Sequence, residues 1–309
     1  MINIIDIFCG CGGLSLGFQN AGFNIVSAFD NWDKAVEIYN KNFNHGAKLI
    51  DAYDLTPEYL GSFSPDMIVG GPPCQDYSSA GKQDETKGRA DLTLRFTELV
   101  CAVYPEWFVM ENVDRILKSQ TLPKAIALFK STGYGLSQVV LDASLCGVPQ
   151  KRKRFFLIGH KYEDDNFLTS KLYADLSKKS TTIREYLGDE FQTEYYYRHP
   201  RSYARRAIFS IDEPSPTVRG VNRPIPPCYS IHSGDATKDL NKVRPLTTLE
   251  RARIQTFPKT FKFSGNKTDL EQIIGNAVPV DLARYVALHI KEYIENPTHA
   301  PVQLQLNLN

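Results

Sequence analysis

The chain has 309 residues, a formal net charge of +1 and 42% hydrophobic residues, a composition ordinary for a soluble globular protein with a sizeable core. Its first ten residues lack the pattern of a signal peptide and no stretch is long enough to span a membrane, so we expect a cytoplasmic protein without membrane contact. The six cysteines are too scattered for a secreted disulfide scaffold, and we expect reduced thiols.

Over residues 1–160, short apolar runs alternate with amphipathic ones. This alternation is typical of strand and helix units around a mostly parallel sheet, and it predicts a doubly wound, Rossmann-like α/β fold. We expect strands at residues 2–8, 24–29, 67–70, 107–110, 138–141 and 155–159, and helices at residues 14–20 and 34–43.

A glycine-rich turn, DIFCGCGG, joins the first predicted strand to the first helix. Its glycines, Gly10, Gly12 and Gly13, let the backbone approach a ligand, and the helix N-terminus offers free N–H groups. The GxGG spacing fits a nucleoside with a charged amino-acid tail better than a dinucleotide; a tight turn without a ligand is the alternative. Cys9 and Cys11 have no CxxC pair or clustered histidines, so we expect no metal site.

Two acidic residues follow short apolar runs. Asp30 ends the second predicted strand, where an acid can accept hydrogen bonds from ribose hydroxyls or cap the helix that begins near Trp32. Asp54 could meet an adenine amino group or cap a turn. These residues alone leave both choices open.

A cysteine, an acid and two arginines stand beside later strands. In GGPPCQDYSSAG, Cys74 follows two prolines in a turn-forming loop, which suits an activated nucleophile better than an inert core thiol. Glu111 follows an apolar run in EWFVMENV, where burial would raise its pKa and make it a proton donor, although a cap fits too. In QKRKR, Arg152 and Arg154 alternate with lysines, so both would fall on one strand face, able to bind an oxygen or a phosphate.

Beyond residue 160 the composition shifts to Lys, Ser, Thr, Tyr, Arg and Pro. We expect a catalytic and cofactor-binding domain at 1–160 and a smaller, irregular domain at 161–268, because its many prolines break helices and central strands. An amphipathic C-terminal helix at 269–295 would return to the first domain, and 296–309 would form a polar tail. The basic runs KRKR and YYYRHPRSYARR are either a solvated face or a nucleic-acid contact.

These motifs occur in the same order in the cytosine-C5 DNA methyltransferases, and nearly the whole chain resembles that family in its bacterial or phage modification-methylase form. FCGCGG resembles the family's cofactor loop, GGPPCQDYS its nucleophile loop, ENV its acid and QKRKR its paired arginines; RPLTTLERARIQTFP and GNAVPVDLAR resemble its last two blocks. The resemblance implies the S-adenosylmethionine-dependent methyltransferase fold, a target-recognition domain, double-stranded DNA as substrate, and S-adenosylmethionine as the cofactor that leaves as S-adenosylhomocysteine.

Carried over residue by residue, the resemblance assigns catalytic roles to four side chains. Cys74 would attack C6 of a flipped-out cytosine, and Glu111 would protonate or hydrogen-bond N3. Arg154 would hold O2, and Arg152 would support the loop or a phosphate.

The resemblance also assigns cofactor and DNA contacts. The cofactor residues are Phe8, Gly10, Cys11, Gly12, Gly13, Asp30, Asn31, Trp32, Asp54, Pro73, Asn276 and Val278. Asn31 and Trp32 are both candidates for the adenine edge, and the family more often has glutamate where Asp30 stands. The DNA-contacting residues are Gln75, Ser78, Arg89, Gln150, Arg205, Arg206, Arg219 and Arg223, with Arg219 and Arg223 favoured for reading bases.

Three other functions compete with this interpretation. A tRNA cytosine methyltransferase shares the chemistry, but its loop resembles Cys-Phe-Thr more than PPCQDYS. A catalytically silent DNA-binding paralogue would not need Cys74, Glu111 and Arg154 together, and a nicotinamide-dependent oxidoreductase has no use for a PPCQ loop. We therefore expect a monomeric DNA (cytosine-5-)-methyltransferase with a restriction–modification role, whose cognate restriction endonuclease would be a functional partner.

Overall fold

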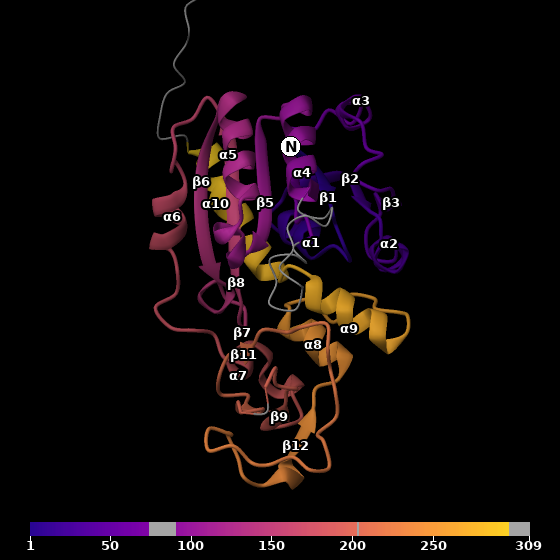
Figure 1. Ribbon diagram of the computed structural model, residues 1–309, viewed down its shortest axis with the longest axis vertical. Coiled ribbons are helices and arrows are strands. Elements are labelled where there is room, and N and C mark those ends of the chain that lie inside the picture. The colour runs from indigo at the N-terminus through magenta and orange to yellow at the C-terminus, as the bar shows by residue number, and fades with distance from the viewer. Residues whose placement is uncertain (74–90, 203, 297–309) are drawn as a thin grey trace, which may run out of the picture.

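The computed structural model describes residues 1–73, 91–202 and 204–296, which form a larger and a smaller part (Figure 1). In the larger part, a seven-stranded sheet of described residues has the order β3-β2-β1-β4-β5-β8-β6. The strands run parallel except β8, which is antiparallel to β5 and β6. Its strands are β1 (Asn3–Ile7), β2 (Asn24–Asp30), β3 (Ala47–Leu49), β4 (Met67–Gly70), β5 (Trp107–Val113), β6 (Tyr134–Asp142) and β8 (Lys153–Lys161). The predicted α/β fold with a mostly parallel sheet is confirmed.

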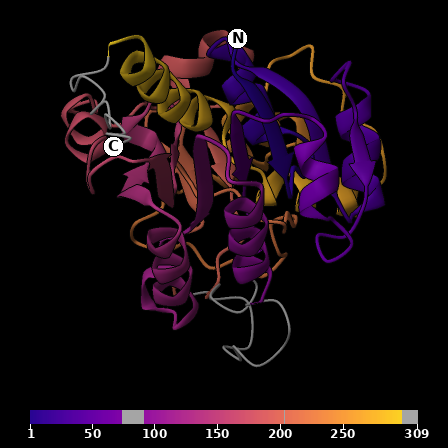
Figure 2. The ribbon, with the colours of Figure 1, turned by 90° about the horizontal axis from the view of Figure 1, so that it is seen from above.

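Helices cover both faces of this sheet. Helices α1 (Gly13–Asn20) and α10 (Val280–Glu295) pack together on one face, and α4 (Asp91–Val103) and α5 (Thr121–Ser131) pack together on the other (Figure 2). Separate buried apolar clusters, one containing Phe18 and the other Phe96, fill the two layers. The larger part also contains α2 (Asp33–Asn40), α3 (Pro57–Gly61), α6 (Thr169–Ala174) and the 3-10 helices η1 (Asp114–Lys118) and η2 (Ala143–Leu145).

Helices α1 and α10 touch most closely at Gly17. A Cβ at this position would lie 2.6 Å from the Val280 carbonyl oxygen and 2.7 Å from the Arg284 nitrogen. These distances leave no room for any side chain, so glycine is required here for the two helices to pack.

The smaller part consists of short elements joined by long connections. Strand β9 (Tyr195–Tyr197) lies between β10 (Ile208–Ser210), which is antiparallel to it, and β12 (Val243–Pro245), which is parallel. Strand β11 (Ser215–Pro216) pairs with β7 (Gln150–Lys151), just before β8 begins. The helices of this part are α7 (Ile183–Leu187), α8 (Thr248–Ile254), α9 (Lys267–Asn276) and the 3-10 helices η3 (Gly188–Glu190) and η4 (Leu240–Lys242).

The two parts share a buried apolar cluster. It includes Tyr39 and Phe43 from α2 and the loop after it, and Phe257 and Phe261 from the loop after α8. The rings of Phe43 and Phe261 meet edge to face with centroids 6.1 Å apart. This common core fixes the smaller part against the larger one.

No helix in the described ranges has the length and apolar character needed to cross a membrane.

The sheet topology determines where a site can form. The chain runs outward from β1 through β2 to β3, then returns and runs the other way through β4 and β5. In such sheets a ligand crevice lies beyond the carboxyl ends of the strands where the order reverses, here β1 and β4. The glycine turn follows β1, Pro72 and Pro73 follow β4, and Glu111 lies near the end of β5. The predicted cofactor turn, the proline loop and Glu111 therefore lie at the carboxyl ends of three neighbouring strands.

Candidate active site

The turn after β1 is tight. Phe8 has a φ of 66°, a left-handed conformation that costs a non-glycine residue energy and that is often found at functional sites. Its N–H and that of Cys9 donate to the Phe29 carbonyl oxygen at 2.9 and 3.0 Å, which ties the turn to β2. The Gly12 N–H donates to the Cys9 carbonyl oxygen at 2.9 Å and closes the turn just before α1 begins.

The three glycines of this turn have different reasons to be glycine. Gly10 has a positive φ of 54°, and a Cβ built on it would meet nothing within 4 Å, so it borders open space. A Cβ on Gly12 would overlap the Phe43 ring, and one on Gly13 would overlap the Val278 carbonyl oxygen. Only Gly10 therefore leaves its space open to a ligand, whereas Gly12 and Gly13 are required for packing.

Asp30 holds this turn in place. One carboxylate oxygen accepts from the Gly10 N–H at 2.8 Å and the other from the Trp32 N–H at 2.9 Å. Burial raises the pKa of Asp30, and these backbone hydrogen bonds lower it in part. Because Trp32 is the N-cap residue of α2, Asp30 anchors the turn and does not occupy the cap position. Each oxygen keeps a lone pair that can accept from a hydroxyl.

A second acid, Asp6, lies buried in β1 and was missed by the sequence analysis. Its Oδ2 accepts from the Ser15 hydroxyl at 2.5 Å; the Tyr39 hydroxyl donates to Ser15 at 2.8 Å and also contacts His45 Nε2 at 2.8 Å. Asp6 Oδ1 has no hydrogen-bond partner among the described residues. Burial, with a smaller contribution from Asp30, raises the pKa of Asp6 to about 7. An acid within the apolar run NIIDI was the available signal.

The other predicted cofactor residues differ in how they relate to the glycine turn, and several of them are exposed. The exposed Asn31 donates its amide to Asp51 at 2.8 Å, whereas the Trp32 side chain packs on the shared core. Asp54 is exposed in the turn after β3. Asn276 is the exposed last residue of α9, and Val278 contacts the glycine turn through its carbonyl oxygen.

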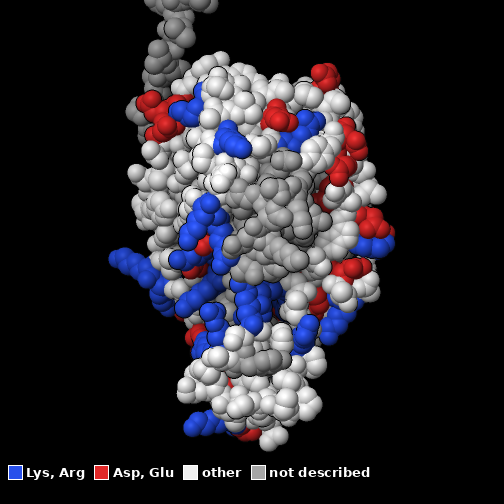
Figure 3. Space-filling view, viewed as in Figure 1, with Lys and Arg blue, Asp and Glu red and all other residues white. Residues whose placement is uncertain are grey.

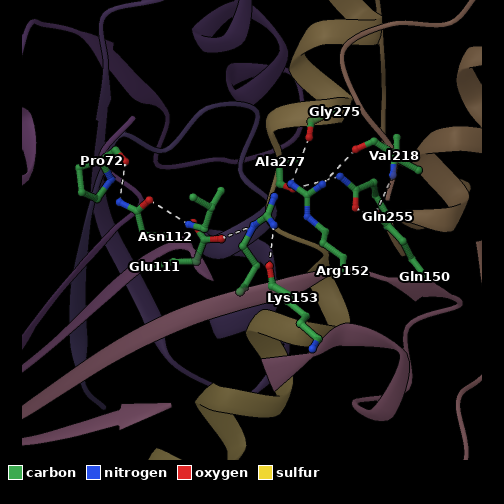
Figure 4. A network of polar contacts seen from close by, with 12 residues as sticks. Pro72, Glu111, Asn112, Gln150, Arg152, Lys153, Val218, Gln255, Gly275 and Ala277 are labelled. Atoms are coloured by element: carbon green, nitrogen blue, oxygen red, sulfur yellow. Dashed lines mark hydrogen bonds and ion pairs between the residues drawn. The ribbon is translucent and has the colours of Figure 1, made fainter. Parts of the chain in front are cut away.

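Glu111 lies against the loop that follows β4. Its Oε1 forms an ion pair with Arg154 Nε at 2.9 Å, and its Oε2 is 3.1 Å from where a Gly71 Cβ would be. The neighbouring Asn112 amide donates to the Pro72 carbonyl oxygen at 3.2 Å (Figure 4). Burial raises the pKa of Glu111 by more than the Arg154 and Arg152 guanidiniums lower it. The acid, its arginine partner and the proline loop therefore form one unit.

Arg152 and Gln150 point into the protein. Arg152 is 1% exposed and donates to the carbonyl oxygens of Val218, Gly275 and Ala277 at 3.0, 3.1 and 3.0 Å (Figure 4). Gln150 is fully buried; it donates to Gln255 at 2.7 Å and accepts from the Val218 N–H at 2.8 Å. The structure corrects the prediction that Gln150 contacts DNA, because this side chain has no exposed surface and binds the protein itself. Arg152 was predicted to support the loop or a phosphate, and its guanidinium binds protein backbone.

The predicted DNA-contacting arginines differ in their surroundings. Arg205 and Arg223 are exposed. Arg219 is partly buried and donates to the His199 carbonyl oxygen. Arg206 pairs with Glu213 and lies over the Phe209 ring at 4.2 Å, so its charge is already engaged within the protein.

Several arginines gather around a small cavity in the smaller part. Arg198, Arg219 and Arg251 line it, and burial and the nearby Arg201 lower the pKa of Arg198 and Arg219; we call these four residues the arginine cluster. Burial, followed by the charge of its arginine neighbours, lowers the pKa of Arg198 to about 10. The Arg198 and Arg219 guanidiniums bind backbone carbonyls, while Arg251 pairs with Glu271. Such concentrated positive charge favours an anionic partner.

Four predicted site residues, Cys74, Gln75, Ser78 and Arg89, lie outside the described residues. Pro73, which precedes Cys74, is the last described residue of the loop after β4. Within the described ranges, no three or more His, Cys, Asp or Glu side chains are grouped so that they could hold a metal ion.

Comparisons with known proteins show which proteins this chain is similar to. The model of a family described as C-5 cytosine-specific DNA methylase matches residues 2–292. The chain is 58% identical to the Type II methyltransferase M.HindV of Haemophilus influenzae, over 95% of this chain and 97% of that protein. It is 54% identical to M.HgiDI of Herpetosiphon aurantiacus, over 95% of each. The crystal structure of S. pombe Dnmt2 methyltransferase shares the fold, with a TM-score of 0.71 at 17% identity over 96% of this chain and 100% of that one.

Proposed function

The chain belongs to the C-5 cytosine-specific DNA methylases, and from this membership we propose how its residues methylate DNA. It is a DNA (cytosine-5-)-methyltransferase, and its Type II relatives fit a restriction–modification role. A tRNA methyltransferase is not favoured. The observation that carries the catalytic proposal is the buried Glu111, paired with Arg154 and lying against Gly71 in the loop that leads to Cys74.

The glycine turn fits S-adenosylmethionine, the methyl donor that the family implies. Gly10 leaves open space, and the half-buried Asp30 and buried Asp6 carboxyls both have raised pKa values that a nearby cation would lower. A molecule with a sulfonium and an ammonium group suits such a pair. The residues that would hold it are Phe8, Gly10, Cys11, Gly12, Gly13, Asp30, Asn31, Trp32, Asp54, Pro73, Asn276 and Val278. When bound, it supplies the electrophilic methyl group that cytosine C5 acquires.

Cys74 and Glu111 make C5 reactive. The Cys74 thiolate forms a bond to C6 while Glu111 donates a proton to N3, so the ring electrons become available at C5. After C5 is methylated, water removes the C5 proton, the C6–S bond breaks and N3 returns its proton to Glu111. Both side chains then regain their starting forms. Arg154 holds the cytosine O2 and keeps Glu111 in place beforehand.

The thiol must reach C6 from above the ring plane, so the target base has to leave the DNA stack. We assign duplex binding to residues 161–268, where the arginine cluster concentrates positive charge. Figure 3 shows Lys and Arg side chains gathered across the middle of one face, at the level of β7 and α8 in Figure 1. Arg223 and Arg219 are proposed to read bases and Arg205 to contact phosphate. We further propose a cytoplasmic monomer that works alongside a cognate restriction endonuclease.

Methylation of a plasmid followed by bisulfite sequencing tests this function. We expect 5-methylcytosine at one cytosine of a short defined site, and no methylation by Cys74→Ser, because a serine hydroxyl is a far weaker nucleophile at neutral pH. The wild type should also be trapped covalently on a duplex with 5-fluorocytosine at that position. Methylation by Cys74→Ser at a rate near the wild type would exclude Cys74 as the nucleophile.

A further inference from the structure

Both backbone polar groups of Val218 are bonded to side chains of the QKRKR motif. Gln150 accepts from the Val218 N–H at 2.8 Å, and Arg152 donates to the Val218 carbonyl oxygen at 3.0 Å. The preceding Thr217 donates its hydroxyl to the Lys151 carbonyl oxygen at 2.8 Å, and β11 pairs with β7 just before it. The segment that leads into Arg219 is therefore held along its length by β7 and by Arg152, just before β8 begins.

The same Arg152 guanidinium reaches the turn between α9 and α10. It donates to Gly275 and Ala277, and Gln255, itself bonded to Gln150, donates to Ala277 at 3.0 Å (Figure 4). The next residue, Val278, lies against the glycine turn. We call residues 217–223 the recognition segment. The Arg152 side chain thus bridges this segment and the turn that supports the glycine turn.

The two segments bridged by Arg152 are also in direct contact. A Cβ on Gly275 would overlap the Gly220 nitrogen and the Arg219 carbonyl carbon, so the backbone of residues 219–220 rests on the end of α9. Arg251, from α8, also donates to the Arg219 carbonyl oxygen. A contact between backbones with no side chain between them leaves little freedom for sliding.

Two residues further along the chain, Arg154 pairs with Glu111. The short stretch from Gln150 to Arg154 therefore holds the recognition segment at one end and the catalytic acid at the other. A planar guanidinium with five donors can bind three carbonyl oxygens at once, which a lysine ammonium on a flexible stem does less precisely.

We infer that Arg152 is a positioning residue that sets the arginines of the recognition segment, Arg219 and Arg223, at a fixed place relative to Glu111 and the glycine turn. This inference rests on the proposed function. It assigns Arg152 no contact with the base or with phosphate. Its role is to ensure that a duplex correctly read at Arg219 and Arg223 presents its cytosine to Glu111.

Arg152→Lys tests this inference, since it keeps the charge and removes the planar fork. We expect the ratio of kcat/KM for the target duplex to that for a single-mismatch duplex to fall at least tenfold. The Kd for S-adenosylhomocysteine should stay within twofold of the wild type. Thr217→Val removes only the hydrogen bond from Thr217 to the Lys151 carbonyl oxygen, so it should lower the ratio less. Lys153→Gln, a loss of charge at an exposed neighbour, should leave the ratio unchanged.

An ordinary stabilising role gives a different result. If Arg152→Lys only lowers the melting temperature and keeps the wild-type ratio at a temperature well below it, the inference is overturned. If Arg152→Lys does not fold, Thr217→Val decides, and an unchanged ratio in that variant overturns the inference as well. Failure of the proposed function is distinguishable, because the wild type itself would then methylate no DNA.

Discussion

Asp30 and Asp6 lie beneath the same turn but have different partners. Asp30 is bonded to two backbone N–H groups, whereas Asp6 is bonded to a hydroxyl that belongs to a buried Ser15–Tyr39 pair. A carboxylate held by N–H donors tolerates ionisation better than one with a buried hydroxyl partner and an unpaired oxygen. The two acids should therefore respond differently when their charge is removed.

Replacement of Asp30 by Asn should weaken cofactor binding. The neutral amide keeps the side chain's shape but offers one acceptor oxygen instead of two, and we expect the Kd for S-adenosylmethionine to rise at least tenfold, about 1.4 kcal/mol. Isothermal titration calorimetry measures it, with Asp33→Asn in the exposed first turn of α2 as the matched control. An unchanged Kd for Asp30→Asn would restrict Asp30 to anchoring the turn.

Replacement of Asp6 by Asn should change how stability depends on pH. Because burial raises the pKa of Asp6 from 3.8 to about 7, the folded protein keeps a proton that the unfolded chain releases. Wild-type stability therefore loses this contribution as pH rises from about 4 to about 7. Asn cannot ionise at position 6, so the melting temperature of Asp6→Asn should rise relative to that of the wild type across this pH range. At pH 8 it should be the higher of the two. A melting-temperature difference that is constant from pH 5 to pH 8 would contradict this assignment.

At the scale of the elements, the contact between α1 and α10 depends on the absence of a side chain at Gly17. Gly17→Ala would place a methyl group less than 3 Å from the backbone of α10. We expect it to destabilise the protein by about 1–3 kcal/mol, the usual cost of overpacking. Urea denaturation measures the change.

Gly61→Ala provides the control for Gly17→Ala. Gly61 ends α3, and a Cβ there would meet nothing within 4 Å. The same substitution should be neutral or slightly stabilising at this site. Equal effects at the two positions would mean that the α1–α10 contact is not tightly packed.

How well the sequence predicted each element depended on the burial of that element. Strands β1 and β4 are buried almost throughout and read as continuous apolar runs. Strand β3 was not predicted because two of its three residues are exposed. Strand β6 was predicted too short, since Gly135 interrupts its apolar pattern where a Cβ would overlap Glu163. The antiparallel direction of β8 leaves no trace in composition, because it is set by its pairing with β5 and β6.

The residues of the site were also predicted unequally well. Motif order placed Glu111 beside the proline loop and Asp30 beside Gly10, because both depend on strand ends that meet at one edge. Alternation in QKRKR predicted that Arg152 and Arg154 point away from Lys151 and Lys153, and Arg152 is buried between the two exposed lysines. It did not predict the carbonyl partners of Arg152, because these lie far along the chain and depend on tertiary packing. The partners of Asp6 are distant in sequence, so its role depends on tertiary packing.

At the scale of the whole molecule, two exposed arginines test whether base recognition and phosphate binding belong to different residues. Arg223→Ala should lower discrimination against a single-mismatch duplex by about 1–3 kcal/mol if Arg223 makes a bidentate guanine contact. Arg205→Ala should weaken binding to all duplexes alike and reduce the salt dependence of affinity, because a phosphate contact carries no sequence information. Affinities for both duplexes at several salt concentrations separate these results.

Arg206→Ala serves as the comparison for those two variants. Its guanidinium is already paired with Glu213, so we expect a loss of stability with little change in the salt dependence of affinity. If Arg205, Arg206 and Arg223 variants all weaken every duplex equally, none of them reads bases, and specificity comes from other side chains or from DNA deformation.

Helix α10 begins 260 residues after α1 ends, yet α1 needs it as a cover at Gly17. A ribosome adding roughly 5–20 residues per second needs on the order of 10–50 s to make that stretch. Throughout this time α1 has no α10 to cover it at Gly17. A chain truncated before Val280 would never complete this layer. A cell newly given this gene would therefore wait for the synthesis of α10 before each protein molecule could modify its first site.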